Sequence, residues 1–158
     1  MIERRRPNQI AGYALRGYDQ GVGRVLWFAS CGQVDKVIEA IQSFSNTRHN
    51  DLWGGIGLAC AYAGGVPIEE LRPLFDAAGE EAPALLQGIC FAVTARYRAG
   101  NVLPHTEEIA AAFLNMTPGE AAALSDRLEK NLPEDQAVEA YEIWRQRLQN
   151  EFGPSSGP

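Results

Sequence analysis

The chain has 158 residues, of which 46% are apolar and 22% are charged. This length and composition suit one folded domain with its own core, and they exclude a wholly disordered chain. The net charge is −6, and an acidic surface repels nucleic-acid phosphates and anionic lipid headgroups, so we expect neither nucleic acid nor a membrane as partner.

The N-terminal residues do not resemble a secretory signal. The basic run Arg4–Arg6 is followed by Pro7-Asn8-Gln9, where a signal peptide would have an apolar stretch. The best apolar run, Val25–Cys31, is too short to cross a bilayer. Three cysteines in apolar surroundings are an odd number, typical of a reducing cytoplasm, and we expect a cytoplasmic protein. The predicted organisation is a flexible flank at 1–11, one helical-repeat domain at 12–152 and a disordered tail at 153–158.

A glycine-rich segment recurs along the first hundred residues. Its three copies are Gln20–Ala29, Gly54–Ala63 and Gln87–Ala95. Gly21 and Gly55 are 34 positions apart and Gly55 and Gly88 are 33 apart, a period that predicts stacked helical hairpins. Each copy is apolar nearly all round, which predicts a buried helix.

Glycine inside a helix costs about 1 kcal/mol relative to alanine, so several of them favour close packing between helices. A phosphate-binding loop is the alternative for Gly21-x-Gly23 and Gly55-x-Gly57. Neither segment has the preceding strand or the following Lys-Ser/Thr that a phosphate-binding loop requires, so helix packing is favoured.

Amphipathic helices are predicted between and after these segments. Their apolar sets are Val34/Val37/Ile38/Ile41, Ile68/Leu71/Leu74/Phe75 (which Pro73 should bend or shorten) and Ile109/Ala112/Phe113/Met116. Glycines at Gly32, Gly64-Gly65 and Gly100 fall where helix C-caps are expected. We therefore predict an all-α fold of about eight helices in a curled or open stack, similar in period to tetratricopeptide repeats. It departs from that repeat where Glu69 stands in place of a small residue.

Two further helices are predicted near the C-terminus. Thr117 to Glu120 reads as a capping box with Pro118 at the first helical position. The last helix is predicted to begin at Pro133. Its apolar stripe is Val138, Tyr141, Trp144, Leu148 and Phe152.

Few residues offer catalytic chemistry. His105 and Glu108 are three apart at a predicted helix start, but two ligands are too few for metal, so we expect no metal or cofactor. The acidic pair Glu107-Glu108 is also explained as first-turn acids that favour the helix dipole. The remaining acid–base candidates are His105 with Glu107, or Asp19 with Arg24. The cysteines have no neighbouring base that would make a thiolate, which favours core packing.

Polar and aromatic side chains on the buried helices are candidate ligand contacts. Arg24 lies on an almost wholly apolar helix and must either pair with an acid such as Asp19 or Asp51 or line a cavity. The candidate binding set for a flat, conjugated ligand is Arg24, Trp27, Trp53, Tyr62, Arg96 and His105. The aromatic members fit a repeat core equally well.

Several runs, in the same order, resemble one family. They are Gly17–Phe28, Asp51–Gly65, Gln87-Gly88, Arg98–Asn101, Pro104–Glu107 and Ile143–Arg145. Together they are similar to the C-terminal half of an uncharacterised bacterial family found in gene clusters for enediyne polyketides. Members are typically about twice this length, so the resemblance implies a partner, a second copy or another biosynthetic protein, that covers the end of the stack.

The resemblance implies an accessory protein that binds a hydrophobic polyene or enediyne intermediate or holds its enzymes together. Two alternatives stay open at this point. One is a cyclase- or isomerase-type enzyme acting on such an intermediate, and the other is a general protein-interaction scaffold.

Overall fold

The computed structural model describes residues 8–134 and 139–153, and this part of the chain is all-α, as predicted. Its α-helices are α1 (Tyr13–Ala29), α2 (Val34–Gln42), α3 (His49–Ala63), α4 (Ile68–Ala78), α5 (Ala82–Arg98), α6 (Pro104–Ile109), α7 (Pro118–Glu129) and α8 (Ala140–Phe152). Short 3-10 turns at Asn46–Arg48 and Gly79–Glu81 precede α3 and α5, and a π-helical turn at Ala110–Leu114 follows α6.

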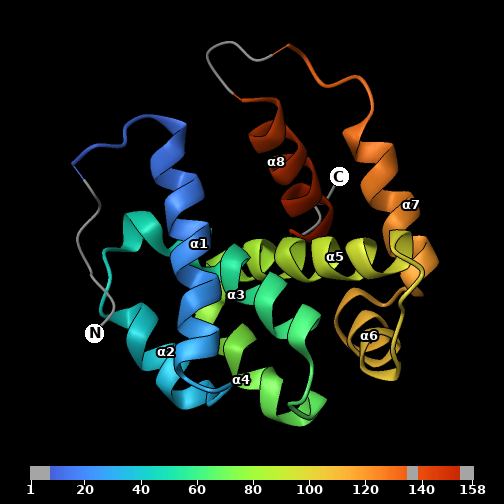
Figure 1. The fold of residues 1–158 in the computed structure, drawn as a ribbon, viewed down its shortest axis with the longest axis horizontal. Coiled ribbons are helices and arrows are strands. Elements are labelled where there is room, and N and C mark those ends of the chain that lie inside the picture. The colour runs from blue at the N-terminus through green and yellow to red at the C-terminus, as the bar shows by residue number, and fades with distance from the viewer. Residues whose placement is uncertain (1–7, 135–138, 154–158) are drawn as a thin grey trace, which may run out of the picture.

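The three glycine-bearing helices, α1, α3 and α5, pack one against the next (Figure 1). α3 packs between α1 and α5, and α5 also contacts α7 and α8. Trp53 and Ile56 of α3 and Leu85 and Ile89 of α5 are almost fully buried, which places the core along these crossings. The outer helices α2 and α4 pack against each other. α6 has only six residues, so a regular stack of equal hairpins stays a prediction.

Backbone contact at glycine joins α1 to α3. A Cβ atom at Gly23 would lie 2.2 Å from the carbonyl oxygen of Leu52, and one at Gly55 would lie 2.1 Å from that of Gln20. Both distances are far inside van der Waals contact, so neither position has room for a side chain.

The same contact recurs between α3 and α5. A Cβ atom at Gly57 would lie 2.1 Å from the carbonyl oxygen of Leu85, and one at Gly88 would lie 2.1 Å from that of Gly54. The helices approach this closely only because side chains are missing at these four positions. Close packing is therefore the reason for these glycines.

The helix ends follow their predicted chemistry. Gly32, Gly64 and Gly100 have positive φ angles of 70°, 68° and 64°, the conformation that ends a helix at low cost in glycine. Thr117 Oγ1 accepts from the Glu120 backbone N–H, and Glu120 accepts from the Thr117 N–H, as a capping box requires. Pro73 does not end α4, which continues to Ala78.

The predicted start of the last helix was wrong. Pro133 and Glu134 are not helical, and α8 begins at Ala140 after Glu139, which has an extended backbone. Predictions for residues 1–7, for Val138 and for residues 154–158 lie outside the described residues. Within the described chain, no helix combines the length and apolar character that a membrane span needs.

Candidate functional site

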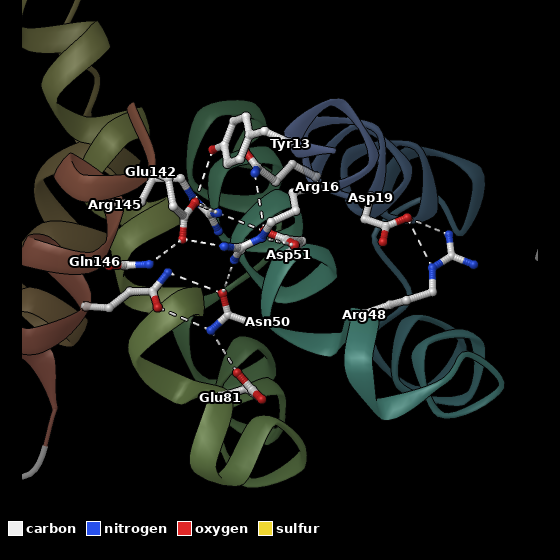
Figure 2. A network of polar contacts seen from close by, with 12 residues as sticks. Tyr13, Arg16, Asp19, Arg48, Asn50, Asp51, Glu81, Glu142, Arg145 and Gln146 are labelled. Atoms are coloured by element: carbon white, nitrogen blue, oxygen red, sulfur yellow. Dashed lines mark hydrogen bonds and ion pairs between the residues drawn. The ribbon is translucent and has the colours of Figure 1, made fainter. Parts of the chain in front are cut away.

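Four charged side chains from α1, α3 and α8 meet in one cluster (Figure 2). Arg145 Nη1 donates to Asp51 Oδ1 (2.7 Å) and to Glu142 Oε2 (2.8 Å). Arg16 donates from Nε to Asp51 Oδ2 (2.8 Å) and from Nη1 to Glu142 Oε1 (2.6 Å). We call Arg16, Asp51, Glu142 and Arg145 the ionic cluster. Its two positive and two negative charges balance, which offsets the cost of taking them out of water.

The cluster is buried at its centre. Asp51, Glu142 and Arg145 are buried and Arg16 is half-buried. A Cβ atom at Gly54 would lie 3.2 Å from Arg145 Nη2, so this glycine makes room for the guanidinium. Arg145 Nη2 is itself buried and has no hydrogen-bond partner among the described residues.

Neutral side chains extend the cluster on both sides. Tyr13 Oη donates to Glu142 Oε2 (3.1 Å) and Gln20 Nε2 donates to Asp51 Oδ1 (3.3 Å). On the α5 side, Arg145 Nε donates to Gln87 Oε1 (3.1 Å). These bonds fix the orientation of both carboxylates and connect α8, which is distant in sequence, to α1, α3 and α5.

Burial and the Glu142 charge raise the pKa of Tyr13 to about 12. Burial lowers the pKa of Arg145, but the charges of Asp51 and Glu142 raise it more, and its net pKa lies above the ordinary arginine value. The net pKa of Arg16 is raised for the same reason, chiefly by Asp51. The phenol therefore keeps its proton and both guanidiniums keep their charge at neutral pH. None of these three groups exchanges a proton readily there.

An aromatic group adjoins the ionic cluster. The rings of Tyr13 and Tyr141 meet edge to face with centroids 6.4 Å apart, and Trp144 lies 6.2 Å from Tyr141 and 4.7 Å from Phe91. Burial raises the pKa of Tyr141. The Trp144 indole donates to the backbone carbonyl of Ser125 (3.1 Å), so this ring helps to hold α8 against α7.

The structure separates the predicted Asp19–Arg24 pair. Asp19 is buried and its Oδ1 accepts from Arg48 Nη2 (2.6 Å) and Nε (3.1 Å). Arg24 is exposed and forms no hydrogen bond or ion pair within the described residues. Asp51, the other acid considered for Arg24, pairs with Arg16 and Arg145. Arg24 is therefore a surface residue that pairs with neither acid.

The predicted ligand set falls into two parts. Trp27 and Trp53 are buried in the core. Tyr62, Arg96 and His105 gather at one corner, where α3 and α5 end and α6 begins. The Arg96 guanidinium lies 4.3 Å from the Tyr62 ring centroid and its Nε donates to the Tyr62 carbonyl (3.2 Å). The His105 ring would lie 2.8 Å from a Cβ atom at Gly64, and its Nε2 is buried without a partner among the described residues.

The remaining candidates are either exposed or inert. Glu107 is exposed in the first turn of α6. Burial raises the pKa of Cys60 and of Cys90 to about 12, which makes both poor nucleophiles. Within residues 8–134 and 139–153, no three His, Cys, Asp or Glu side chains gather closely enough to hold a metal ion. Two surface hollows, one between α2 and α4 and one beside α8, contain none of the predicted ligand residues.

Sequence reasoning selected Asp51 but missed Arg16, Glu142 and Arg145. A usable signal was present: Glu142 and Arg145 are three apart, and Arg145 shares one helix face with Tyr141 and Leu148. A charged residue on an apolar helix face, such as Arg145, indicates a buried ion pair. The sequence does not reveal its partner Asp51, 94 positions away, because the tertiary fold brings the two together.

Comparison with family models finds a match over residues 3–152. The model is described as "Protein of unknown function (DUF1702)". The chain belongs to this family. Comparisons with curated proteins and with solved structures found no match.

Proposed function

We propose that this DUF1702 protein is an accessory component of enediyne-type polyketide biosynthesis that acts by binding other proteins, either a second copy of itself or another protein of the pathway. The observation that carries this proposal is that the buried charged side chains pair with one another and so are not free to bind a substrate. Arg16, Asp51, Glu142 and Arg145 form a balanced cluster, and Asp19 pairs with Arg48.

The biosynthetic context comes from the sequence resemblance. The motif order from Gly17–Phe28 to Ile143–Arg145 is similar to the C-terminal half of proteins found in enediyne gene clusters. An assembly role fits the surface of the chain, because the large apolar side chains of Val25 and Phe28 are exposed next to each other on α1. Exposed apolar side chains in a cluster are typical of protein contact sites.

A second candidate is binding of a hydrophobic polyene intermediate at the corner formed by Tyr62, Arg96 and His105. The observation in its favour is the buried His105 Nε2, which has no hydrogen-bond partner among the described residues, in a ring that packs against Gly64, two positions after the exposed Tyr62. A conjugated chain with a polar end would stack on the Tyr62 ring and bond to the imidazole. This corner is also the best place for a cyclase- or isomerase-type reaction, with His105 as the acid or base. An Asp19–Arg24 reaction has less support, since Asp19 pairs with Arg48.

Gene disruption in the native host tests the biosynthetic role. We expect the enediyne-type product to fall and wild-type complementation to restore it, whereas unchanged production would overturn the proposal.

Native mass spectrometry of the protein from its producing cells separates the two candidates. A retained polyene mass that is lost in Tyr62→Ala but kept in the Tyr97→Ala control would favour ligand binding. A protein complex without small molecule would favour assembly. Conversion of an added polyene by the purified protein would favour the enzyme alternative.

A further inference from the structure

The outer side of α1 carries small and apolar residues, together with the exposed Arg24, and no helix of the described chain covers them. Gly17, Gly21, Val25 and Phe28 share this side at spacings of four, four and three, and we call them the outer face of α1. Val25 is 52% exposed and Phe28 is 60% exposed. A Cβ atom at Gly17 or Gly21 would meet no atom of the described chain within 4 Å.

In the other two glycine-bearing helices, the glycine equivalent to Gly21 is the site where another helix packs. Gly55 and Gly88, its counterparts at spacings of 34 and 33, each face a carbonyl of the preceding glycine-bearing helix at a Cβ distance of 2.1 Å. Gly21 has the same place in α1 and faces none. α1 therefore carries an unused copy of the surface that α3 and α5 use for packing.

The residue four positions after each glycine supports this equivalence. A side chain at that spacing lies on the same helix face. Ala59 follows Gly55 and is 2% exposed, and Ala92 follows Gly88 and is 1% exposed. The corresponding residue after Gly21 is Val25. It is larger and more apolar than either alanine, but more than half of it is exposed.

The internal crossings indicate what fits this surface. In the contact between α1 and α3, each helix contributes a glycine and the carbonyl three residues before it: Gly23 with Gln20, and Gly55 with Leu52. The contact between α3 and α5 uses the same two elements from each side. Both sides of the crossing are thus alike, and a surface that matches itself suits a two-fold symmetric pair.

We propose that two copies of this chain pair through the outer face of α1. Gly21 of each copy faces the Tyr18 carbonyl of the other across a two-fold axis, as Gly23 and Gly55 face carbonyls within the chain. Val25 and Phe28 become buried beside this crossing. The inference rests on the assembly part of the proposed function and names the partner and the surface.

Sedimentation velocity over a concentration series from micromolar to submillimolar tests the pairing. We expect the wild-type chain, of 17.2 kDa, to sediment at twice that mass at the higher concentrations. The double variant Val25→Asp/Phe28→Asp places charge on the face and should sediment as a monomer throughout.

Gly21→Leu is the second variant, and it separates loss of pairing from loss of folding. Leucine is a better helix former than glycine, and position 21 has free space in the single chain. At concentrations at which the wild type is also a monomer, we expect this variant to unfold at the same or a higher temperature than the wild type. We expect it to remain monomeric at the concentrations at which the wild type pairs. Leu103→Asp is the matched control: Leu103 is 43% exposed and precedes α6, where aspartate is a favourable cap, so added charge alone should leave the dimer unchanged.

A wild-type monomer at every concentration would overturn the inference, as would a dimer that persists in both face variants. Failure here is distinguishable from failure of the proposed function. A monomeric protein whose gene is still needed for the product refutes the α1 dimer alone, whereas a dimer whose gene is dispensable refutes the biosynthetic role alone.

Discussion

Helix α3 is held on its two sides by different physical means. Toward α1 and α5 the contact is backbone against backbone, with Gly23, Gly55, Gly57 and Gly88 in place of side chains. Toward α8 the contact is made by charges, with Asp51 bound to Arg145. The first kind of contact fails when an atom is added, and the second fails when a charge is removed. The two regions therefore respond to opposite kinds of substitution.

The largest expected effect comes from removing one charge of the ionic cluster. Arg145→Met leaves Asp51 and Glu142 with only Arg16 as a cation, and an uncompensated buried charge typically costs about 3–5 kcal/mol of unfolding free energy. Urea denaturation at neutral pH measures this loss. The double variant Glu142→Gln/Arg145→Met restores the charge balance and should recover part of it. An equal loss in both variants would show that packing of the Arg145 stem, and not charge, holds α8.

Adding one carbon to a glycine crossing should have the next largest effect. In Gly88→Ala the new methyl would lie 2.1 Å from the Gly54 carbonyl, so the helices must separate, and overpacking of this kind costs about 1–3 kcal/mol. Gly21→Ala is the matched control. It makes the same change at the equivalent position, where the single chain has free space. At protein concentrations too low for two copies to pair, it should instead stabilise the helix by up to about 1 kcal/mol. Thermal unfolding of both variants under those conditions measures whether each change lowers or raises the stability. A loss of stability at both positions would contradict the explanation that Gly88 is needed for close helix packing.

Tyr13 should make the unfolding free energy depend on pH in the alkaline range. Tyr13→Phe removes the hydrogen bond to Glu142 and should cost about 1 kcal/mol at neutral pH. The folded pKa of about 12 lies above the ordinary tyrosine pKa of 10.0, so folding favours the protonated phenol. That stabilisation is complete below pH 10 and is lost as the pH rises toward 12. Urea denaturation across this range should show a shallower loss of stability in Tyr13→Phe than in the wild type, and parallel curves would exclude Tyr13 as a contributor.

The smallest effect is expected at an exposed ion pair. Arg98 bonds to Asp126 and Glu129 near the ends of α5 and α7, and all three side chains are largely in water. Because solvent screens such pairs, Arg98→Ala should change the unfolding free energy by less than about 1 kcal/mol. A loss comparable to that of Arg145→Met would mean that burial is not what distinguishes the two sets of charges.

The sequence by itself determined the all-α class, the three glycine-bearing helices, their C-terminal glycines and the Thr117 capping box. These features depend on local spacing: an apolar period, a glycine where φ must be positive, and a hydroxyl three residues before a carboxylate. The glycine period also predicted close helix packing, because glycine inside a helix has a cost that only a near neighbour explains.

Only the tertiary structure decided which charges meet. Arg24 and Arg16 lie on the same helix, yet one is exposed and the other bridges Asp51 and Glu142. The sequence favoured Arg24 because its neighbours are apolar, but the apolar residues beside it, Val25 and Phe28, are themselves exposed. Long-range pairs such as Asp51–Arg145 depend on how whole helices cross, and local periodicity carries no information about that angle.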